Sequence, residues 1–107
     1  MNQQPYRRPL PMRRRSETFE LSHGELNYFI TTGHYRDGSV GEVFINFPKS
    51  GMQAEAIARD SAVLLSLALQ YGMPLDSVSG AITRNYNAEA SSIVGAVVDR
   101  LVKDRME

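Results

Sequence analysis

Apolar and polar residues alternate with a period of two along three short segments in the first half of the chain. This alternation predicts half-buried β-strands. The segments are residues 17–23, 26–35 and 40–47. Gly24 and Glu25 form the first connection, and Asp37 with Gly38 marks a hairpin turn, because both residues of that pair tolerate a positive φ. Connections this short predict an antiparallel meander.

One face of this meander is predicted to be apolar. In the middle strand Leu26, Tyr28, Ile30 and Thr32 share one face, and in the third strand Val43, Ile45 and Phe47 lie on one side. The opposite face of the middle strand is predicted to carry Asn27, Phe29, Thr31 and Tyr35. An apolar sheet face needs a cover from another layer of secondary structure.

Residues 49–72 change to a helical period and predict one long helix that supplies this cover. Ser50 and Gln53 can cap its start by exchanging hydrogen bonds, and Gly72 suits the left-handed position just past its end. Nearly every residue from 62 to 69 is apolar, which predicts burial on most sides of the second half. The predicted buried face consists of Ile57, Ser61, Leu64, Leu65 and Ala68.

Two further helices are predicted over residues 74–83 and 89–104. Pro74 suits the first turn of the shorter one. Asn87, Ser91 and Ser92 compete for the cap of the longer one. The apolar stripes are Leu75, Val78 and Ile82 in the first, and Ile93, Val94, Val97, Val98, Leu101 and Val102 in the second. The predicted fold class is α+β, a three-stranded antiparallel meander followed by three helices in two layers.

The amino-acid composition limits the classes of protein to which the chain can belong. The chain has 107 residues, 42 % of them hydrophobic, which predicts one domain. It contains no cysteine, so disulfides, thiolate metal sites and cysteine nucleophiles are excluded. No apolar run is long enough to span a bilayer, and no apolar segment follows the N-terminal arginines as in a secretory signal. We therefore expect a cytoplasmic protein without a membrane partner.

The formal net charge is zero, but the charges are unevenly distributed along the chain. Residues 1–15 contain five arginines and no acid, so the remainder has a net charge of −5. Three prolines disfavour a helix there, and we expect a basic arm over residues 1–16 attached to a single domain over 17–107. Such an arm can contact the phosphates of a nucleotide or nucleic acid, fold back on its own body, or dock on a neighbouring copy.

Several short motifs carry a family resemblance. They are RPLP at residues 8–11 near Arg13, TGHYRDG at 32–38, GEVFI at 41–45, KSG at 49–51, and SLALQYG at 66–72 followed by PL at 74–75. In this order they resemble the C-terminal domain of vitamin B12-dependent (class II) ribonucleotide reductases. They also resemble small relatives that consist of this domain alone, some associated with phage or prophage genomes.

The resemblance implies a fold and a link to nucleotide metabolism. The radical-generating barrel of the reductase, with its cobalamin site and catalytic cysteines, is absent from these residues. The cysteine-bearing motif typical of the domain is also absent. The resemblance therefore implies neither reductase activity nor a metal site, and no cofactor is expected.

The candidate ligand-binding residues are basic or lie at the predicted start of the long helix. They are Lys49, Ser50, Gly51, Arg59, Arg84, Asn85, Arg13, Arg14 and Arg15. A helix start with a nearby lysine and a glycine is a plausible anion site, although it serves equally as a capping turn. Arg59 can pair with Glu55 one turn away or face a ligand. Arg84 and Asn85 suit a nucleotide or an ordinary polar loop.

Catalytic residues are not indicated. His23 and His34 are the only histidines, and no acidic ligand pattern surrounds them. Neither a Ser-His-Asp arrangement nor a metal site is predicted. We therefore expect a protein that is not an enzyme.

Two functions remain open. The first is a small binding protein for a nucleotide or nucleic-acid phosphate, in its sharpest form one that sequesters a signalling nucleotide. The alternative is a reductase-like domain that regulates a reductase or another partner through protein–protein contact. Because the last helix is apolar on more than one side, we also expect a homo-oligomer.

Overall fold

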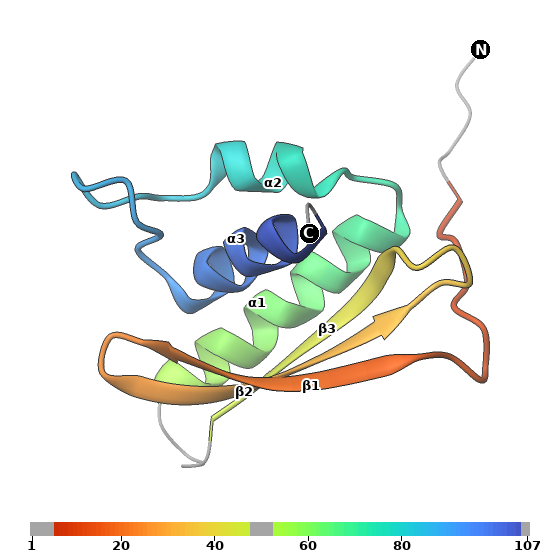
Figure 1. Ribbon diagram of the computed structural model, residues 1–107, viewed down its shortest axis with the longest axis horizontal. Helices are drawn as coiled ribbons and strands as arrows, with labels where there is room; N and C mark the ends of the chain where they lie inside the picture. The colour runs from red at the N-terminus through yellow and green to blue at the C-terminus, as the bar shows by residue number, and fades with distance from the viewer. Residues whose placement is uncertain (1–5, 48–52, 106–107) are drawn as a thin grey trace.

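Three strands and three helices form two layers in the computed structural model (Figure 1), which describes residues 6–47 and 53–105. The elements are β1 (Ser16–His23), β2 (Leu26–His34), β3 (Val40–Asn46), α1 (Gln53–Gln70), α2 (Leu75–Ala81) and α3 (Ile93–Arg105). All three helices lie on the same side of the sheet. The predicted α+β fold is confirmed.

The sheet is antiparallel with the order β1-β2-β3, as predicted. Gly24 and Glu25 form the two-residue turn between β1 and β2 with φ angles of 57° and 66°. Two consecutive positive φ values give a turn whose twist matches that of the flanking strands. In the second connection Gly38 has a φ of 93°, and the Ser39 N–H donates to Asp37 Oδ1 at 2.9 Å.

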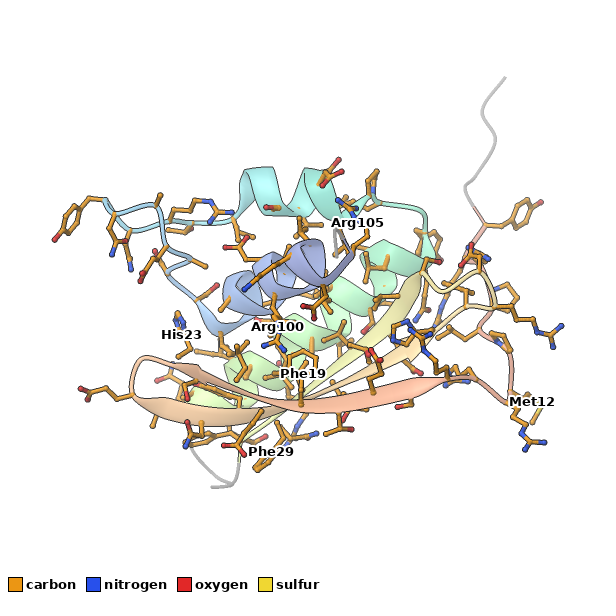
Figure 2. All side chains as sticks on the ribbon, viewed as in Figure 1. Met12, Phe19, His23, Phe29, Arg100 and Arg105 are labelled. Carbon is orange, nitrogen blue, oxygen red and sulfur yellow. The ribbon has the colours of Figure 1, made fainter. Side chains whose placement is uncertain are left out.

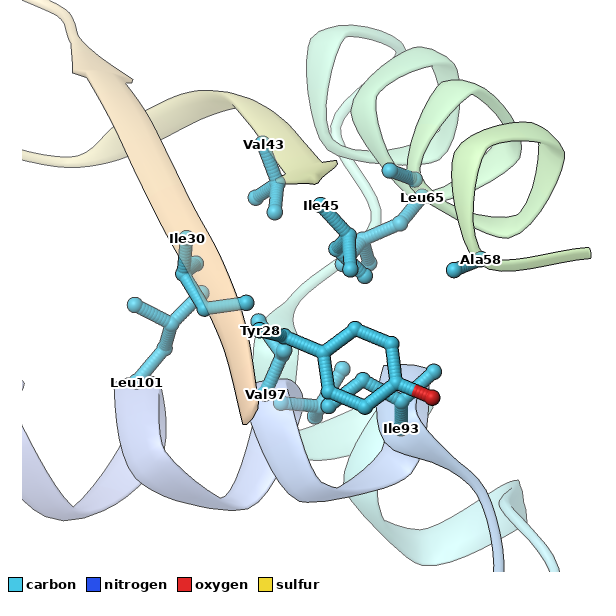
Figure 3. Packing of buried hydrophobic residues seen from close by; sticks show 11 residues of the cluster. Tyr28, Ile30, Val43, Ile45, Ala58, Leu65, Ile93, Val97 and Leu101 are labelled. Atoms are coloured by element: carbon cyan, nitrogen blue, oxygen red, sulfur yellow. The ribbon is translucent and has the colours of Figure 1, made fainter. Parts of the chain in front are cut away.

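The core lies between the sheet and the helices (Figure 3). Tyr28, Ile30 and Thr32 of β2 are buried, and so are Val43 and Ile45 of β3. The apolar face predicted from the period of two is therefore confirmed. Figure 2 shows Phe29 on the other side of the sheet, away from the helices, where it is 43 % exposed.

Tyr35 was predicted on the face opposite the core, yet it is buried. The register shifts between Gly33 and His34, which breaks the alternation just before Tyr35. Its ring then lies over Gly41, where an added Cβ would be 2.5 Å from the ring, and its hydroxyl donates to the Arg8 carbonyl at 2.7 Å. The prediction failed because a bulge re-aims the side chain and the arm covers it.

The predicted buried face of α1 is also wrong. Ile57 is 56 % exposed and Leu64 is 68 % exposed. Of the predicted face Leu65 is buried, and it shares the observed buried face with Ala58 and Ala62, which were not predicted. The two alanines let α1 approach β3 closely. The helix also has a second apolar stripe, and periodicity alone cannot decide which of the two is buried. Burial on most sides of the second half is likewise not observed.

The end of α1 follows its prediction. Gly72 has a φ of 96°, its N–H bonds to the Leu69 carbonyl at 3.0 Å, and the Met73 N–H bonds to the Ala68 carbonyl at 3.0 Å. This pair of bonds satisfies carbonyls that the helix end leaves free. The predicted capping exchange between Ser50 and Gln53 falls on Ser50, which lies outside the described residues.

Side chains of α1 cover part of the free edge of β3. The Ser66 hydroxyl accepts from the Val43 N–H at 2.8 Å and lies 3.1 Å from the Val43 carbonyl. The Gln70 side-chain amide donates to the Gly41 carbonyl at 2.9 Å. An edge strand presents unpaired backbone groups that would otherwise pair with another chain. The helix therefore both packs on the sheet and closes one edge.

The last helix buries its predicted stripe, with Val97 and Val98 fully enclosed. It begins at Ile93 rather than at residue 89, because Arg84 and Ala90 pair as an isolated bridge that ties the preceding loop back on itself. Ser92 provides the cap, since its hydroxyl accepts from the Gly95 N–H at 3.1 Å. Among residues 6–47 and 53–105, no helix combines the length and apolarity needed to cross a bilayer.

We predict that Ser66→Ala destabilises the fold by about 1–3 kcal/mol, because the Val43 N–H then loses its partner at a packed edge. Urea unfolding followed by circular dichroism measures the change. Ser77→Ala is the matched control, since this exposed α2 serine forms no side-chain bond with a described residue. Equal stability of both variants would contradict the role assigned to Ser66.

Candidate functional site

The residues predicted to form one binding site are distributed over the fold. Lys49, Ser50 and Gly51 lie outside the described residues. Arg59 forms an ion pair with Glu55 on the same helix face, which is the structural use foreseen from their spacing. It also borders a hollow of about 300 Å³ between α1 and β3, together with Arg7 and Phe44.

Arg84 holds the α2–α3 connection in place. Its guanidinium donates to both carboxylate oxygens of Asp99 at 2.9 Å, to the Ser79 carbonyl at 2.9 Å and to the Ala88 carbonyl at 3.1 Å. Hydrogen bonding to Asp99 raises the pKa of Arg84, and the bonds from Arg84 lower the pKa of Asp99. Few of its donors are left for a ligand.

Asn85 is used by the same loop. Its side-chain oxygen accepts from the Ser91 hydroxyl at 2.7 Å, and its backbone N–H donates to the Glu89 carbonyl at 2.8 Å. Tyr86 stands fully exposed at the loop tip. Of the two uses left open for this loop, a nucleotide site or an ordinary polar loop, these contacts favour the second, because its polar groups bond within the loop.

The three consecutive arginines make different contacts. Arg14 donates to Glu42 at 2.6 Å, and this hydrogen bond raises the pKa of Arg14. Arg13 makes no ion pair or hydrogen bond with a described residue and borders neither hollow. Arg15 borders a groove, and its carbonyl accepts from the His34 N–H at 3.0 Å, which continues the pairing of β1 with β2.

The groove beside Arg15 is the larger of the two hollows, with a volume of about 570 Å³. Its walls come from the arm, β1, the β2–β3 connection, the end of α1 with the connection to α2, and the end of α3; we call it the arm groove. Arg8 and Arg15 of the arm border it, together with Arg105 from the distant end of α3. Phe19, Val40, Leu69, Leu75 and Leu101 provide its apolar surface.

The arm reaches the groove because its backbone is tied to α1. The Arg8 N–H donates to the Gln70 carbonyl at 2.8 Å, and the Arg7 guanidinium donates to the Gln70 side-chain oxygen. Arg8 then stacks on the Tyr35 ring, with its guanidinium carbon 3.8 Å from the ring centre. At least part of the arm therefore docks on its own body, one of the uses foreseen for it.

Positive charge in the arm groove is only partly neutralised. Arg8 lies 3.4 Å from Asp37, and Arg105 lies 2.7 Å from Asp76. Each of these acids is more than half exposed, so solvent screens both pairs. Arg15 forms no ion pair among the described residues. Glu17 and Asp104 also border the groove and would repel an anion, so an anionic group would have to bind on the arginine side.

His34 is buried at the groove with both ring nitrogens engaged. Nδ1 lies 3.0 Å from the Gly38 carbonyl, and Nε2 lies 2.8 Å from the Thr32 hydroxyl. His23 instead lies at the other end of the sheet, 3.3 Å from the Ser91 carbonyl. Within residues 6–47 and 53–105, no three His, Cys, Asp or Glu side chains are placed to hold a metal ion.

Sequence reasoning missed Arg8, His34, Tyr35 and Arg105 as groove residues. The concentration of arginines in the arm was the available signal for Arg8. No local pattern connects Arg105 to residues almost a hundred positions earlier. Only the packing of α3 against the sheet brings them to one groove.

Comparison with known families agrees with this architecture. Residues 4–104 match the TSCPD domain model, so the chain belongs to the TSCPD domain family. The match covers nearly the whole chain, including both the arm and α3.

The chain is similar to parts of much longer curated proteins. It is 38 % identical over 77 residues to the vitamin B12-dependent ribonucleotide reductase of Agrobacterium fabrum, covering 72 % of this chain and 6 % of that protein. The protein of the same name from Bradyrhizobium diazoefficiens gives the same values. The one from Rhodopirellula baltica is 36 % identical over 74 residues, covering 69 % of this chain and 7 % of that protein.

The sequence resemblance to the reductases is therefore confirmed. The chain spans less than a tenth of the length of these three relatives. No solved structure matches it.

We predict that the Arg84–Asp99 pair makes stability depend on pH in the acid range. Arg84 lowers the folded-state pKa of Asp99. The pair's contribution to the free energy of unfolding is therefore complete above the unfolded pKa of about 3.9, and it is lost as pH falls through the folded pKa. The pair is about a third exposed, which keeps the contribution below about 1 kcal/mol.

Urea midpoints measured between neutral and strongly acidic pH provide the test. Asp99→Asn should be less stable than the wild-type chain at neutral pH, and the difference should shrink toward acidic pH. Asp76→Asn is the control, because its carboxylate is 70 % exposed. A difference in stability between Asp99→Asn and the wild type that does not change with pH would exclude this dependence on the ionisation of Asp99.

Proposed function

We propose that this TSCPD domain is a non-catalytic binding module that holds a phosphate-bearing nucleotide in the arm groove. The observation that carries the proposal is the meeting of two arginines of the arm with one from the distant end of α3 at one apolar-lined groove. Guanidinium groups bind phosphate through paired, charge-assisted hydrogen bonds. A volume of about 570 Å³ is in the range that small-molecule sites occupy.

The two kinds of surface in the groove match the two parts of a nucleotide. Arg8, Arg15 and Arg105 suit the phosphates, and the Phe19 ring with its aliphatic neighbours suits a base or sugar. A groove of this size suits a free nucleotide better than a long nucleic acid. The curated relatives are named ribonucleotide reductases, and ribonucleotides carry the phosphate that these arginines would recognise.

A binding role is favoured over catalysis by the state of His34. Both ring nitrogens already face internal partners, so neither is placed to take a proton from a ligand. Glu17 and Asp104 border the groove without a nucleophile hydrogen-bonded to either among the described residues. The proposed module therefore retains or presents its nucleotide, and sequestration of a signalling nucleotide is the sharpest form of this role.

The matched pair Arg15→Ala and Arg13→Ala tests the proposal. Both variants remove one arginine from the same short segment, but only Arg15 borders the groove. Titration calorimetry with ribonucleotides, deoxyribonucleotides and cyclic nucleotides identifies the ligand. We expect Arg15→Ala to weaken binding roughly 10-fold or more, the loss typical of a charge-assisted hydrogen bond, and Arg13→Ala to bind almost as the wild type.

Two results would contradict the proposed function. One is the absence of heat and of any melting-temperature shift across the nucleotide panel with the wild-type chain. The other is equal weakening by Arg13→Ala and Arg15→Ala, which would indicate general charge attraction rather than a site.

A second candidate function is docking on another protein through the open face of the sheet. Phe29 and Phe44 lie there, 43 % and 50 % exposed, on neighbouring strands. Exposed aromatic residues on a sheet without a cover are typical of interaction surfaces. Loss of co-elution with a B12-dependent reductase in Phe44→Ser, with nucleotide binding unchanged, would favour this function.

A further inference from the structure

The second apolar stripe of α1 has no partner among the described residues. Ile57, Leu64 and Tyr71 are 56 %, 68 % and 50 % exposed. They are separated by seven residues each, so they follow one line along the helix and just past its end. Ser61 and Ala68 lie between them on the same line. We call these five residues the outer stripe.

The outer stripe is distinct from the face that α1 uses to pack on the sheet. The packing face contains Ala58, Ala62 and Leu65, about a quarter turn or more around the helix. The outer stripe itself carries no charge, and Asp60 at its border is the nearest acid. Three large apolar side chains in a row on a surface helix mark an interaction site rather than scattered exposure.

Large and small side chains follow in the same order on both sides of Leu64 along the outer stripe. Small residues follow at Ser61 and Ala68, and large ones at Ile57 and Tyr71. A two-fold axis through Leu64 would therefore place large residues opposite large ones and small opposite small. We propose that the outer stripe is the contact of a homodimer in which two α1 helices pack antiparallel.

This arrangement defines the contacts. Leu64 meets Leu64 of the partner subunit at the axis, and Ile57 meets Tyr71 of the partner subunit at each end. Ser61 faces Ala68 of the partner subunit, and these small side chains let the two helix backbones approach closely. The same patch serves both subunits, as in most two-fold dimers.

Hydrogen-bond complementarity favours a second copy as the occupant. Asp60 lies within reach of the hydroxyl of Tyr71 of the partner subunit, which can donate to its carboxylate. The two Asp60 carboxylates are eight residues apart along the antiparallel axes, or about 12 Å, so their repulsion is screened. Arg59 does not oppose this contact, because it is directed to Glu55 on another side of the helix.

The size of the contact sets its expected strength. α1 has 18 residues and is about 27 Å long. One helix pair of this length is at the small end for a stable interface, so we expect a dissociation constant on the order of micromolar. None of the five residues borders the arm groove, so the dimer and nucleotide binding are independent proposals.

The homodimer also changes the reason for expecting an oligomer. The argument from sequence relied on the valine-rich last helix. In the structure Val97 and Val98 of α3 are fully buried between the sheet and α2, and they are not available to a partner. The outer stripe of α1 provides the surface instead.

Sedimentation velocity from low to several hundred micromolar is the first test. The wild-type chain should shift from a one-chain to a two-chain mass over this range. Leu64→Glu should stay at a one-chain mass, whereas Val63→Glu should dimerise as the wild type does, because Val63 borders the other hollow. A one-chain mass of the wild type at every concentration would overturn the proposal.

Disulfide trapping is the second test, and it does not require a substitution that disrupts the dimer contact. The chain has no cysteine, so each introduced cysteine is unique. Leu64→Cys should cross-link to itself under mild oxidation, since residues at the axis come within disulfide reach. Ile57→Cys should cross-link with Tyr71→Cys but not with itself.

Self-linking of Ile57→Cys would indicate a parallel pair and overturn the antiparallel dimer. Binding of a reductase at the outer stripe by a wild-type chain that never dimerises would overturn it as well.

Discussion

The contact of α1 with the free edge of β3 is the interaction on which the rest of the structure depends. Ala58 and Ala62 let the helix come close, and Ser66 and Gln70 then reach the backbone of the edge strand. A buried polar side chain is costly unless it is bonded, and Gln70, only 5 % exposed, uses both ends of its amide. One end binds the Gly41 carbonyl and the other accepts from Arg7.

Gln70 therefore links three parts of the chain that form the arm groove. Its carbonyl receives the Arg8 N–H, so the arm is held where Arg8 can stack on Tyr35. Arg15 follows at the start of the sheet, and Arg105 arrives with the end of α3. The proposed nucleotide site is thus a consequence of how the helix closes the sheet edge. The opposite side of α1 remains free for the proposed second copy.

Much of the fold was predictable because its signals are local. Alternation defined the strands, and Gly72 ended α1 as its left-handed conformation requires. The orientation of α1 was not predictable, because the helix carries two apolar stripes and only contact with β3 selects between them. The arm groove was not predictable either, since Arg8 and Arg105 meet only through packing. The pairing of Arg84 with Asp99 was not predictable, because the same guanidinium geometry that suits phosphate also suits a carboxylate.

The most direct test of this account is the nucleotide affinity of Gln70→Leu, measured by calorimetry after circular dichroism has confirmed that the variant is folded. Leucine fills a similar volume but cannot hold Arg7 or the Gly41 carbonyl, so of its bonds to this residue the arm should keep only the one from the Arg8 N–H to the backbone carbonyl at position 70. Binding should then weaken by about 10-fold, as for one lost charge-assisted contact. A folded Gln70→Leu chain that binds the nucleotide as tightly as the wild type would contradict the claim that this junction builds the site.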